Sequence, residues 1–86
     1  MYYIYIIKSE KDGKLYIGST SNIRRRFYEH NKGSVLSTRF RRPFKLIYLE
    51  GYLSKEDAFH REHNLKLGAR ARRQLMIRIV KSLASF

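Results

Sequence analysis

The stretch Tyr3–Thr20, "YIYIIKSEKDGKLYIGST", decides the fold, because it holds two short apolar runs joined by a polar turn. Asp-Gly, present here as Asp12-Gly13, is among the strongest sequence signals for a β-hairpin. We therefore predict strands over Tyr2–Ser9 and Leu15–Ser19, joined by a two-residue turn.

The tyrosines of this hairpin need an explanation, because a buried phenol hydroxyl requires a hydrogen-bond partner that valine or isoleucine would not. A two-residue turn pairs Tyr5 with Thr20 and Ser9 with Tyr16, which places both tyrosines on one face of the sheet. They are then offset by four residues, or roughly 13 Å along the strand. Bringing them together requires a bulge, a strong twist or side chains that lean toward one another.

A helix and a basic loop are expected next along the chain. Ser21 can cap a helix over Asn22–Asn31, and Gly33 is a typical helix stop. The segment Ser34–Pro43 is polar and basic, so we expect it to form a loop.

The second half of the chain predicts one more strand and two helices. Phe44–Tyr52 is apolar on both faces, which favours a central position in the sheet. Ser54 and Asp57 form a capping box that opens a second helix, which ends before Gly68. A third helix over Arg70–Leu83 carries apolar residues at helical spacing.

The element order is therefore ββαβαα, in the α/β (α+β) class: a small, three-stranded, mainly antiparallel sheet flanked by three helices. A chain of 86 residues leaves room for a single domain over residues 1–86. The absence of cysteine excludes a disulfide-linked partner and fits a cytoplasmic protein. Apolar runs stay far below the roughly 20 residues of a membrane span, so we expect no membrane association.

The charge of the chain points to a polyanionic partner. Lys and Arg number 19 against 7 Asp and Glu, a net charge of +12. Nucleic acid, most simply DNA, is the first expectation, because arginine binds phosphate oxygens in a bidentate manner. An acidic membrane surface, an acidic protein partner and basicity that serves only solubility are the alternatives. The predicted nucleic-acid contacts are Arg24, Arg25, Arg39, Arg41, Arg42, Arg70, Arg72 and Arg73.

Two polar residues of the first predicted helix lie at the border of its sheet-facing side. At 100° per residue, Arg26 and His30 stand one helical turn apart near that face. They are candidate site residues. The alternatives are an arginine that extends past the core and a surface histidine near the helix end.

Glu62 is an anomaly in the second predicted helix. Helical geometry places it on the apolar stripe, beside Ala58 and Leu65, where a carboxylate is costly unless it is paired or binds a metal. One possibility is a buried salt bridge to an arginine. The other is a divalent cation held by this carboxylate, by water and by substrate phosphate oxygens.

Together these residues resemble a known family. The segments Tyr3–Tyr5 and Tyr16–Gly18 are separated by ten residues and resemble the paired signature of the GIY-YIG nucleases. Arg26 follows ten residues after Tyr16, His30 follows four residues later, and helical Glu62 follows the third strand. The resemblance covers most of the chain.

The resemblance implies one shared site that hydrolyses phosphodiester bonds. By position, Tyr5, Tyr16, Arg26 and Glu62 correspond to the catalytic residues, and Glu62 to the ligand of Mg²⁺ or Mn²⁺. His30 falls at a position that is histidine in some branches of the family and tyrosine in others. We therefore expect a metal-dependent endonuclease in which Tyr5 and Tyr16 position the attacking water, Arg26 stabilises the phosphoryl charge and His30 can relay a proton.

Two departures from the family pattern qualify this expectation. Tyr3 replaces the first glycine of the signature, a change shared with small stand-alone members. Enzymes of the family usually carry a second domain that selects the target, and 86 residues leave no room for one. A protein partner that gives specificity is therefore possible. A nucleic-acid-binding module without turnover is the alternative function, and a protein of membrane surfaces or acidic partners is a more distant one.

Overall fold

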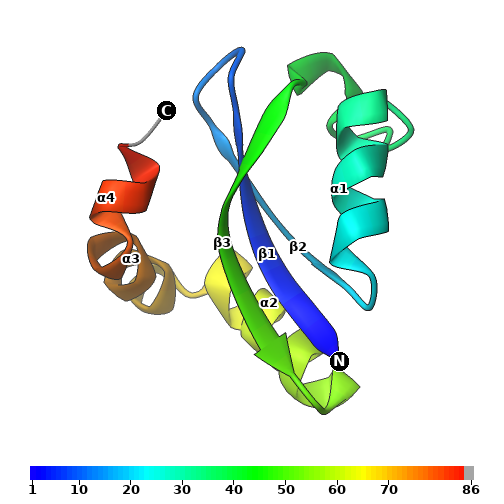
Figure 1. The fold of residues 1–86 in the computed structure, drawn as a ribbon. Helices are drawn as coiled ribbons and strands as arrows, with labels where there is room; N and C mark the ends of the chain where they lie inside the picture. Colours follow the sequence, from blue (N-terminus) through cyan, green and yellow to red (C-terminus); the bar gives the residue numbers. More distant parts are fainter. Residues whose placement is uncertain (85–86) are drawn as a thin grey trace.

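The computed structural model describes residues 1–84 of the chain, and its strands form a single antiparallel sheet. The strands are β1 (Tyr2–Ser9), β2 (Leu15–Thr20) and β3 (Phe44–Tyr52), in the order β2-β1-β3 (Figure 1). Their bounds agree with the predicted strands to within one residue. The antiparallel sheet of the fold prediction is thus confirmed.

The central strand is β1, so the prediction that Phe44–Tyr52 is central was wrong. Four consecutive residues of β1, from Ile4 to Ile7, are buried, as expected for a strand covered on both faces. In β3, by contrast, Lys45, Leu49 and Gly51 are exposed, as is typical of an edge strand.

The register of the hairpin also differs from the predicted one. Tyr5 lies opposite Gly18, and Ile7 lies opposite Tyr16. Tyr5 and Tyr16 are therefore offset by two residues instead of four. Diagonal neighbours at this offset are within reach of aromatic side chains, so the tyrosines meet without a bulge between β1 and β2.

A four-residue turn over residues 10–13 causes this change of register. The Ser9 N–H donates to the Lys14 carbonyl at 2.9 Å, and the Gly13 N–H donates to the Ser9 carbonyl at 2.9 Å. The Ser9 hydroxyl accepts from the N–H groups of Lys11 (3.0 Å) and Asp12 (3.2 Å). Gly13 takes a φ of +72°, which glycine adopts without strain.

The helices cover the two faces of the sheet unequally. Helix α1 (Ile23–Lys32) lies on one face, and α2 (Lys55–Leu67), α3 (Ala69–Arg78) and α4 (Val80–Leu83) lie on the other (Figure 1). The order of the main elements is ββαβαα, as predicted. A short 3₁₀ helix, η1 (Arg39–Arg41), interrupts the predicted loop.

Local signals place the helix ends close to where the sequence suggests. Asn22, and not Ser21, caps α1 by accepting from the Arg25 N–H at 3.0 Å, and Gly33 ends the helix at a φ of +90°. Ser54 caps α2 by accepting from the Asp57 N–H at 3.3 Å.

The predicted third helix is divided at Ile79 into α3 and α4. Ile79 leaves helical geometry with a ψ of 25°, although its N–H still donates to the Leu75 carbonyl at 3.0 Å. The Ile79 side chain is buried in the core, so packing holds this residue in place. Within residues 1–84, no helix is long and apolar enough to cross a bilayer.

A separate apolar core lies on each side of the sheet. Ile4 and Ile6 of β1 pack against α2 and α3 through Ala58, Leu65 and Leu75. On the α1 side, a smaller cluster holds Tyr5, Ile7 and Phe44, with Tyr16, Ile23 and Phe27 at its margin. This second cluster contains the predicted site tyrosines.

Candidate active site

Tyr5 and His30 form a buried pair between β1 and α1. The Tyr5 Oη atom lies 2.7 Å from His30 Nε2, within hydrogen-bond distance. The exposed fractions of Tyr5 and His30 are 1% and 0%. The alternative of a surface histidine is therefore wrong, and the pair supplies the partner that the Tyr5 hydroxyl requires.

Thr38 holds the other nitrogen of the His30 ring. Its Oγ1 atom lies 2.8 Å from His30 Nδ1, and Thr38 is itself fully buried. When Nδ1–H donates to Thr38, Nε2 is free to accept the Tyr5 proton; in the other tautomer Nε2–H donates to Tyr5. Sequence patterns do not single out Thr38, because it stands in a segment whose polar, basic character predicts only an exposed loop.

Tyr16 completes an aromatic group around this pair. Its ring centroid lies 6.3 Å from that of Tyr5 and 5.0 Å from that of His30. Tyr16 is only partly buried, so its ring borders the buried pair and also reaches the surface. The structure thus brings together Tyr5, Tyr16 and His30, three of the predicted site residues.

Gly18 creates the space that the Tyr5 hydroxyl occupies. A Cβ atom added at Gly18 would lie 2.4 Å from Tyr5 Oη, well inside van der Waals contact. The Tyr5 phenol therefore extends across the backbone of β2, because the residue opposite it has no side chain.

The pKa values of Tyr5 and His30 favour the neutral forms. Burial raises the pKa of Tyr5 to about 12, and Arg26 offsets only part of this effect. Burial lowers the pKa of His30 to about 4, and the charge of Arg26 acts in the same direction. At neutral pH the pair is thus a protonated phenol beside an uncharged imidazole.

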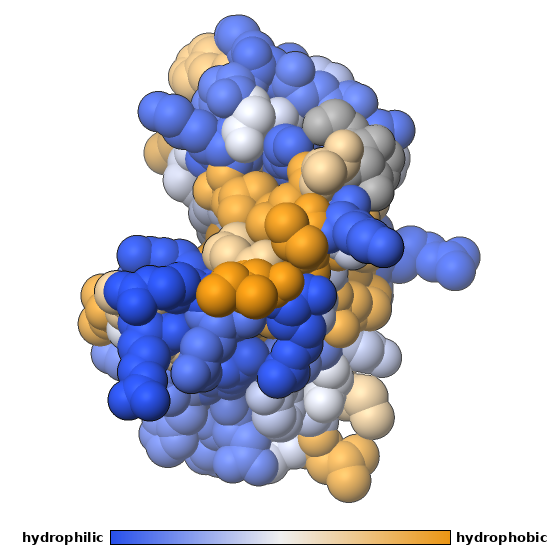
Figure 2. Space-filling model, turned by 90° about the vertical axis from the view of Figure 1, so that its left-hand side faces the viewer, coloured by the Kyte–Doolittle hydropathy of each residue, from blue (hydrophilic) through white to orange (hydrophobic). Residues whose placement is uncertain are grey.

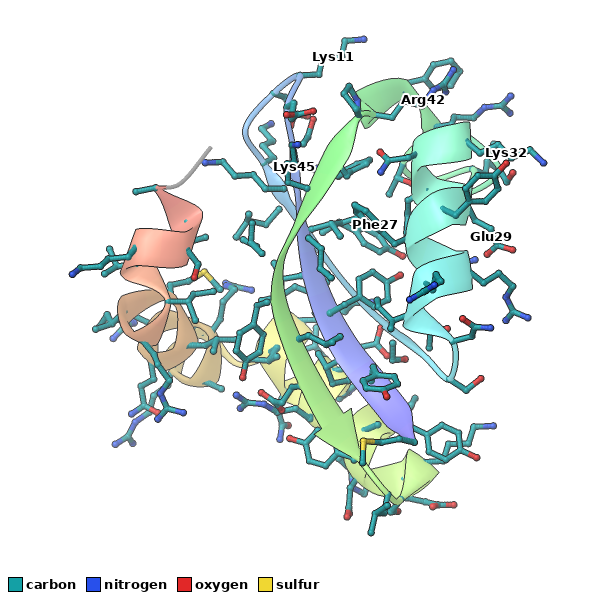
Figure 3. The ribbon with its side chains drawn as sticks, in the orientation of Figure 1. Lys11, Phe27, Glu29, Lys32, Arg42 and Lys45 are labelled. Carbon is teal, nitrogen blue, oxygen red and sulfur yellow. The ribbon has the colours of Figure 1, made fainter. Side chains whose placement is uncertain are left out.

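Arg26 lies beside the tyrosines at the edge of the α1 layer. Its Nη1 atom donates to Glu29 Oε1 at 3.3 Å, and about 36% of its side chain is exposed. Burial acts to lower the pKa of Arg26, but the Tyr5 and Glu29 side chains outweigh it and hold the pKa above its usual value. Figure 3 shows Phe27 pointing from α1 toward the sheet and Glu29 pointing away from it. The Arg26 guanidinium is therefore partly open to solvent and also close enough to Tyr5 to affect the pKa values of both groups.

Glu62 reaches the site from the opposite layer, at the edge formed by β2. Its Oε1 atom accepts from Ser19 Oγ at 2.7 Å, and its Oε2 atom lies 2.8 Å from Lys66 Nζ. The Lys66 Nζ atom also lies 5.9 Å from the centroid of the Tyr16 ring. Glu62 is therefore paired with a lysine and not with an arginine, and β2 separates it from the Tyr5 pair.

Glu62 offers a single carboxylate to a divalent cation. Its side chain is 17% exposed, and the carboxylate already pairs with the ammonium of Lys66, which a metal ion would have to displace. Within residues 1–84, no three His, Cys, Asp or Glu side chains gather into a metal site. A metal ion would thus have one carboxylate, water and substrate oxygens as ligands, an arrangement common for Mg²⁺.

The predicted nucleic-acid contacts on α1 lie at the start of that helix. Arg24 is exposed, and Arg25 Nε lies 4.0 Å from Glu29 Oε2. Ion pairs this long and exposed contribute little to stability, so both guanidinium groups can reach a phosphate.

The loop arginines differ in what they contact. The Arg41 Nε atom lies 3.1 Å from Asp12 Oδ2, which ties the loop to the hairpin turn. Arg42 donates to the carbonyl of Arg39, while Arg39 lies 5.5 Å from the centroid of the exposed Phe40 ring. The Arg41 guanidinium thus already has an ion-pair partner, Asp12, whereas Arg39 and Arg42 are exposed on the surface.

The arginines of α3 lie on the layer opposite α1. Arg70 and Arg73 are exposed, and Arg72 Nη1 donates to the Lys66 carbonyl at 3.0 Å, at the end of α2. Figure 2 shows hydrophilic side chains beside an apolar band on the side that α3 and α4 cover. The predicted contacts therefore spread over both layers, with the β2 edge between them.

Comparison with known proteins identifies the family of the chain. A family model described as the GIY-YIG catalytic domain matches residues 1–75. The chain belongs to the GIY-YIG family. The resemblance seen in the sequence is thus confirmed, and this GIY-YIG chain is a member of a nuclease family whose enzymes commonly use divalent metals.

Relatives of this GIY-YIG protein come from bacteria and archaea. A UPF0213 protein of Staphylococcus saprophyticus is 39% identical over 77 residues, covering 88% of this chain and 93% of the relative. A UPF0213 protein of Natronomonas pharaonis is 38% identical, covering 88% and 89%. The solution structure of the UPF0213 protein of Bacillus halodurans has a TM-score of 0.55 and 37% identity, covering 88% of this chain and 83% of that one.

Proposed function

We propose that this GIY-YIG protein is a metal-dependent endonuclease that hydrolyses phosphodiester bonds in DNA. The observation that carries the proposal is the Tyr5–His30 hydrogen bond of 2.7 Å, with Tyr16 and Arg26 beside it and Glu62 across β2. Phosphodiester hydrolysis needs a positioned water and stabilisation of the phosphoryl charge, and these groups supply both of them.

Tyr5 and Tyr16 orient the attacking water in this proposal. The neutral His30 orients the Tyr5 phenol through the existing hydrogen bond, because a pKa of about 4 leaves the ring uncharged at neutral pH. Burial raises the pKa of Tyr5 to about 12 in the free protein, so its hydroxyl is protonated at neutral pH. Tyr5 therefore acts as an orienting group, and not as a free phenolate.

Arg26 and Glu62 are the residues that act on the negative charge of the phosphate in this proposal. Arg26 stabilises the negative charge that develops on the phosphoryl oxygens, because its guanidinium is partly exposed and oriented by Glu29. Glu62 would hold Mg²⁺ or Mn²⁺, which would neutralise phosphate charge and offset the effect of Glu62 on the Tyr5 pKa.

A second candidate function is a nucleic-acid-binding module without turnover. It is favoured by one observation: both oxygens of Glu62 already have partners, Ser19 and Lys66, as a purely structural carboxylate would. In that case Glu62→Gln would leave the function of the protein unchanged.

A cleavage assay separates the two functions. The purified protein is incubated with single-stranded, duplex and branched DNA and with RNA, in the presence of Mg²⁺, Mn²⁺ or EDTA. We expect cleavage with either metal and none with EDTA or with Glu62→Gln. Binding without cleavage under every condition would support the module instead. Action in the cytoplasm, with or without a protein partner that selects the target, belongs to the same proposal.

A further inference from the structure

A small cavity lies beside Glu62, on the α2 side of the β2 edge. Its volume is about 220 Å³, and its walls include Ser19, Thr20, Ser21, Lys55 and Phe59. Pockets for drug-sized ligands usually measure roughly 300–1,000 Å³, so this cavity suits a single flat ring system. None of the roles proposed above uses it.

Ser19 connects this cavity to the proposed metal ligand. Ser19 forms part of the wall, and its hydroxyl donates to Glu62 Oε1 at 2.7 Å. Lys55 stands seven residues before Glu62 on α2, roughly 10 Å along the helix axis. A group bound in the cavity is therefore separated from Glu62, the proposed metal ligand, by one hydrogen-bonded residue.

The lining of the cavity suits a nucleotide. Phe59 offers an aromatic ring with 59% of the residue exposed, and His63 stacks on it at a centroid distance of 5.9 Å. Lys55 supplies a cationic group for a phosphate, and the hydroxyl of Ser21 can donate to or accept from a base edge. An aromatic ring next to a cationic group is the usual platform for an unpaired base and its phosphate.

A second hollow on the other side of Glu62 repeats this chemistry. Its walls include Tyr16, Lys66 and Arg72, so it again joins an aromatic ring to cationic side chains. Lys66 is also the ion-pair partner of Glu62 at 2.8 Å. Glu62 thus lies between two hollows along the crevice where α2 runs beside β2.

We propose that the cavity beside Phe59 receives an unpaired base of the nucleic-acid substrate, next to the bond that is cut. Phe59 stacks on the base, Lys55 binds the adjoining phosphate, and the strand continues past Glu62 toward Tyr16. This inference rests on the proposed nuclease function and narrows its substrate to strands with unpaired nucleotides. A base inside a duplex is stacked on both faces and cannot enter the cavity without being extruded.

Binding measured without metal tests this site apart from catalysis. A short fluorescent single strand and the same strand annealed to its complement are titrated in EDTA with the parent and with Phe59→Ala. Tyr28→Ala is the matched control, because Tyr28 is 64% exposed on α1 and lies outside the cavity walls. Phe59→Ala should weaken single-strand binding about 5- to 160-fold, since stacking contributes roughly 1–3 kcal/mol per base. Its duplex affinity, and both affinities of Tyr28→Ala, should change less than about twofold.

A second variant tests the phosphate contact. Lys55→Ala should reduce the slope of log K against log salt by about 0.7 for the single strand, the value for one lost phosphate contact. Unchanged single-strand binding by Phe59→Ala, or an equal loss on duplex, would overturn the inference. If the parent cleaves DNA and Phe59→Ala binds normally, only the cavity proposal fails. If the parent never cleaves but Phe59→Ala loses single strands selectively, the cavity stands and the nuclease proposal fails.

Discussion

Tyr5 Oη lies 2.7 Å from His30 Nε2, and this contact joins the central strand to the helix that packs on it. The two residues are 25 positions apart and almost completely buried. Two neutral, hydrogen-bonded groups in a small core form a rigid unit, because neither can move without leaving a buried polar atom unsatisfied. The predicted catalytic tyrosine is therefore held in one orientation before any substrate arrives.

Tyr5→Phe tests whether this hydroxyl takes part in cleavage. The change removes the hydroxyl and keeps the ring, so we expect a loss of about 10²–10⁴ in the cleavage rate, the range for a proton-transfer contact. Nucleic-acid affinity should stay near that of the parent. Tyr3→Phe is the control and should cleave normally, because Tyr3 is only partly buried and lies outside the aromatic group around His30. Equal losses in both variants would contradict a specific role of Tyr5.

Gly18→Ala should displace the Tyr5 hydroxyl. The added Cβ would lie 2.4 Å from Tyr5 Oη, and the buried ring has no free space to retreat into. We expect strongly reduced cleavage together with a lower melting temperature. Gly13→Ala is the matched control on the same hairpin: its Cβ meets nothing within 4 Å, but its φ of +72° makes alanine strained. It should cost about 1–2 kcal/mol of stability and keep full cleavage per folded molecule.

The buried histidine should make the fold sensitive to acid. The pKa of His30 is about 4 in the folded protein and about 6.5 when unfolded, so the unfolded state binds the proton more readily. The stabilising effect of the neutral ring is complete above pH 6.5 and is lost as the pH falls toward 4, by up to about 3 kcal/mol. Thermal melts between pH 7.5 and 4 measure this loss. His30→Phe should show a flatter profile than the parent, whereas His63→Gln, on exposed α2 surface, should keep the parent's slope. A parent profile that His30→Phe leaves unchanged would rule out this account.

Local patterns predicted the elements of the fold, and with them part of the site. The hairpin, the Ser54 cap of α2 and the Gly33 end of α1 are properties of short segments, and the structure contains each of them, although Asn22 and not Ser21 caps α1. The sequence predicts that Tyr5 and Tyr16 lie on one face of the sheet, as they do. Their register differs from the predicted one, because hydrogen bonds to the Ser9 side chain stabilise a longer turn. The same sequence is compatible with a two-residue turn and with a four-residue turn, and only the contacts of the turn backbone distinguish the two.

The partners of the site residues were not predictable in the same way. Thr38 reaches His30 because the basic loop folds back over α1, a contact that no spacing encodes. The contact of Glu62 with Ser19 depends on how α2 lies against the edge strand. The Thr38 and Ser19 contacts thus join elements whose relative placement is set by packing, so periodicity along the chain carries no record of them. The Glu62–Lys66 pair is different, because it is an i,i+4 contact within α2 that helical spacing could have predicted.

Binding should be largely electrostatic, given a net charge of +12 and arginines on both layers. If about six phosphates are neutralised, affinity should fall roughly 10³-fold between 50 and 200 mM salt.

The double variant Arg41→Ala/Arg42→Ala should raise KM with kcat little changed, because neither side chain contacts the Tyr5 pair. A large loss of single-turnover rate at saturating protein would instead place these arginines in the chemistry, and binding that ignores salt would contradict the electrostatic account.

Glu62→Gln separates a metal ligand from a structural carboxylate. Glutamine keeps the shape of the side chain and can still accept from Ser19, but it loses the charge that pairs with Lys66 and that a hard cation requires. We expect cleavage to be abolished while DNA binding stays equal or becomes tighter, because one negative charge near the phosphate disappears.

Arg26→Lys should cost about 10²–10⁴ in rate, since lysine cannot replace the guanidinium contacts to a phosphoryl group. Melting temperatures of both variants must stay close to the parent's for these losses to report on chemistry. A Glu62→Gln protein that still cleaves would remove the metal from this site, whereas one that is more stable than an inactive parent would point to the binding module.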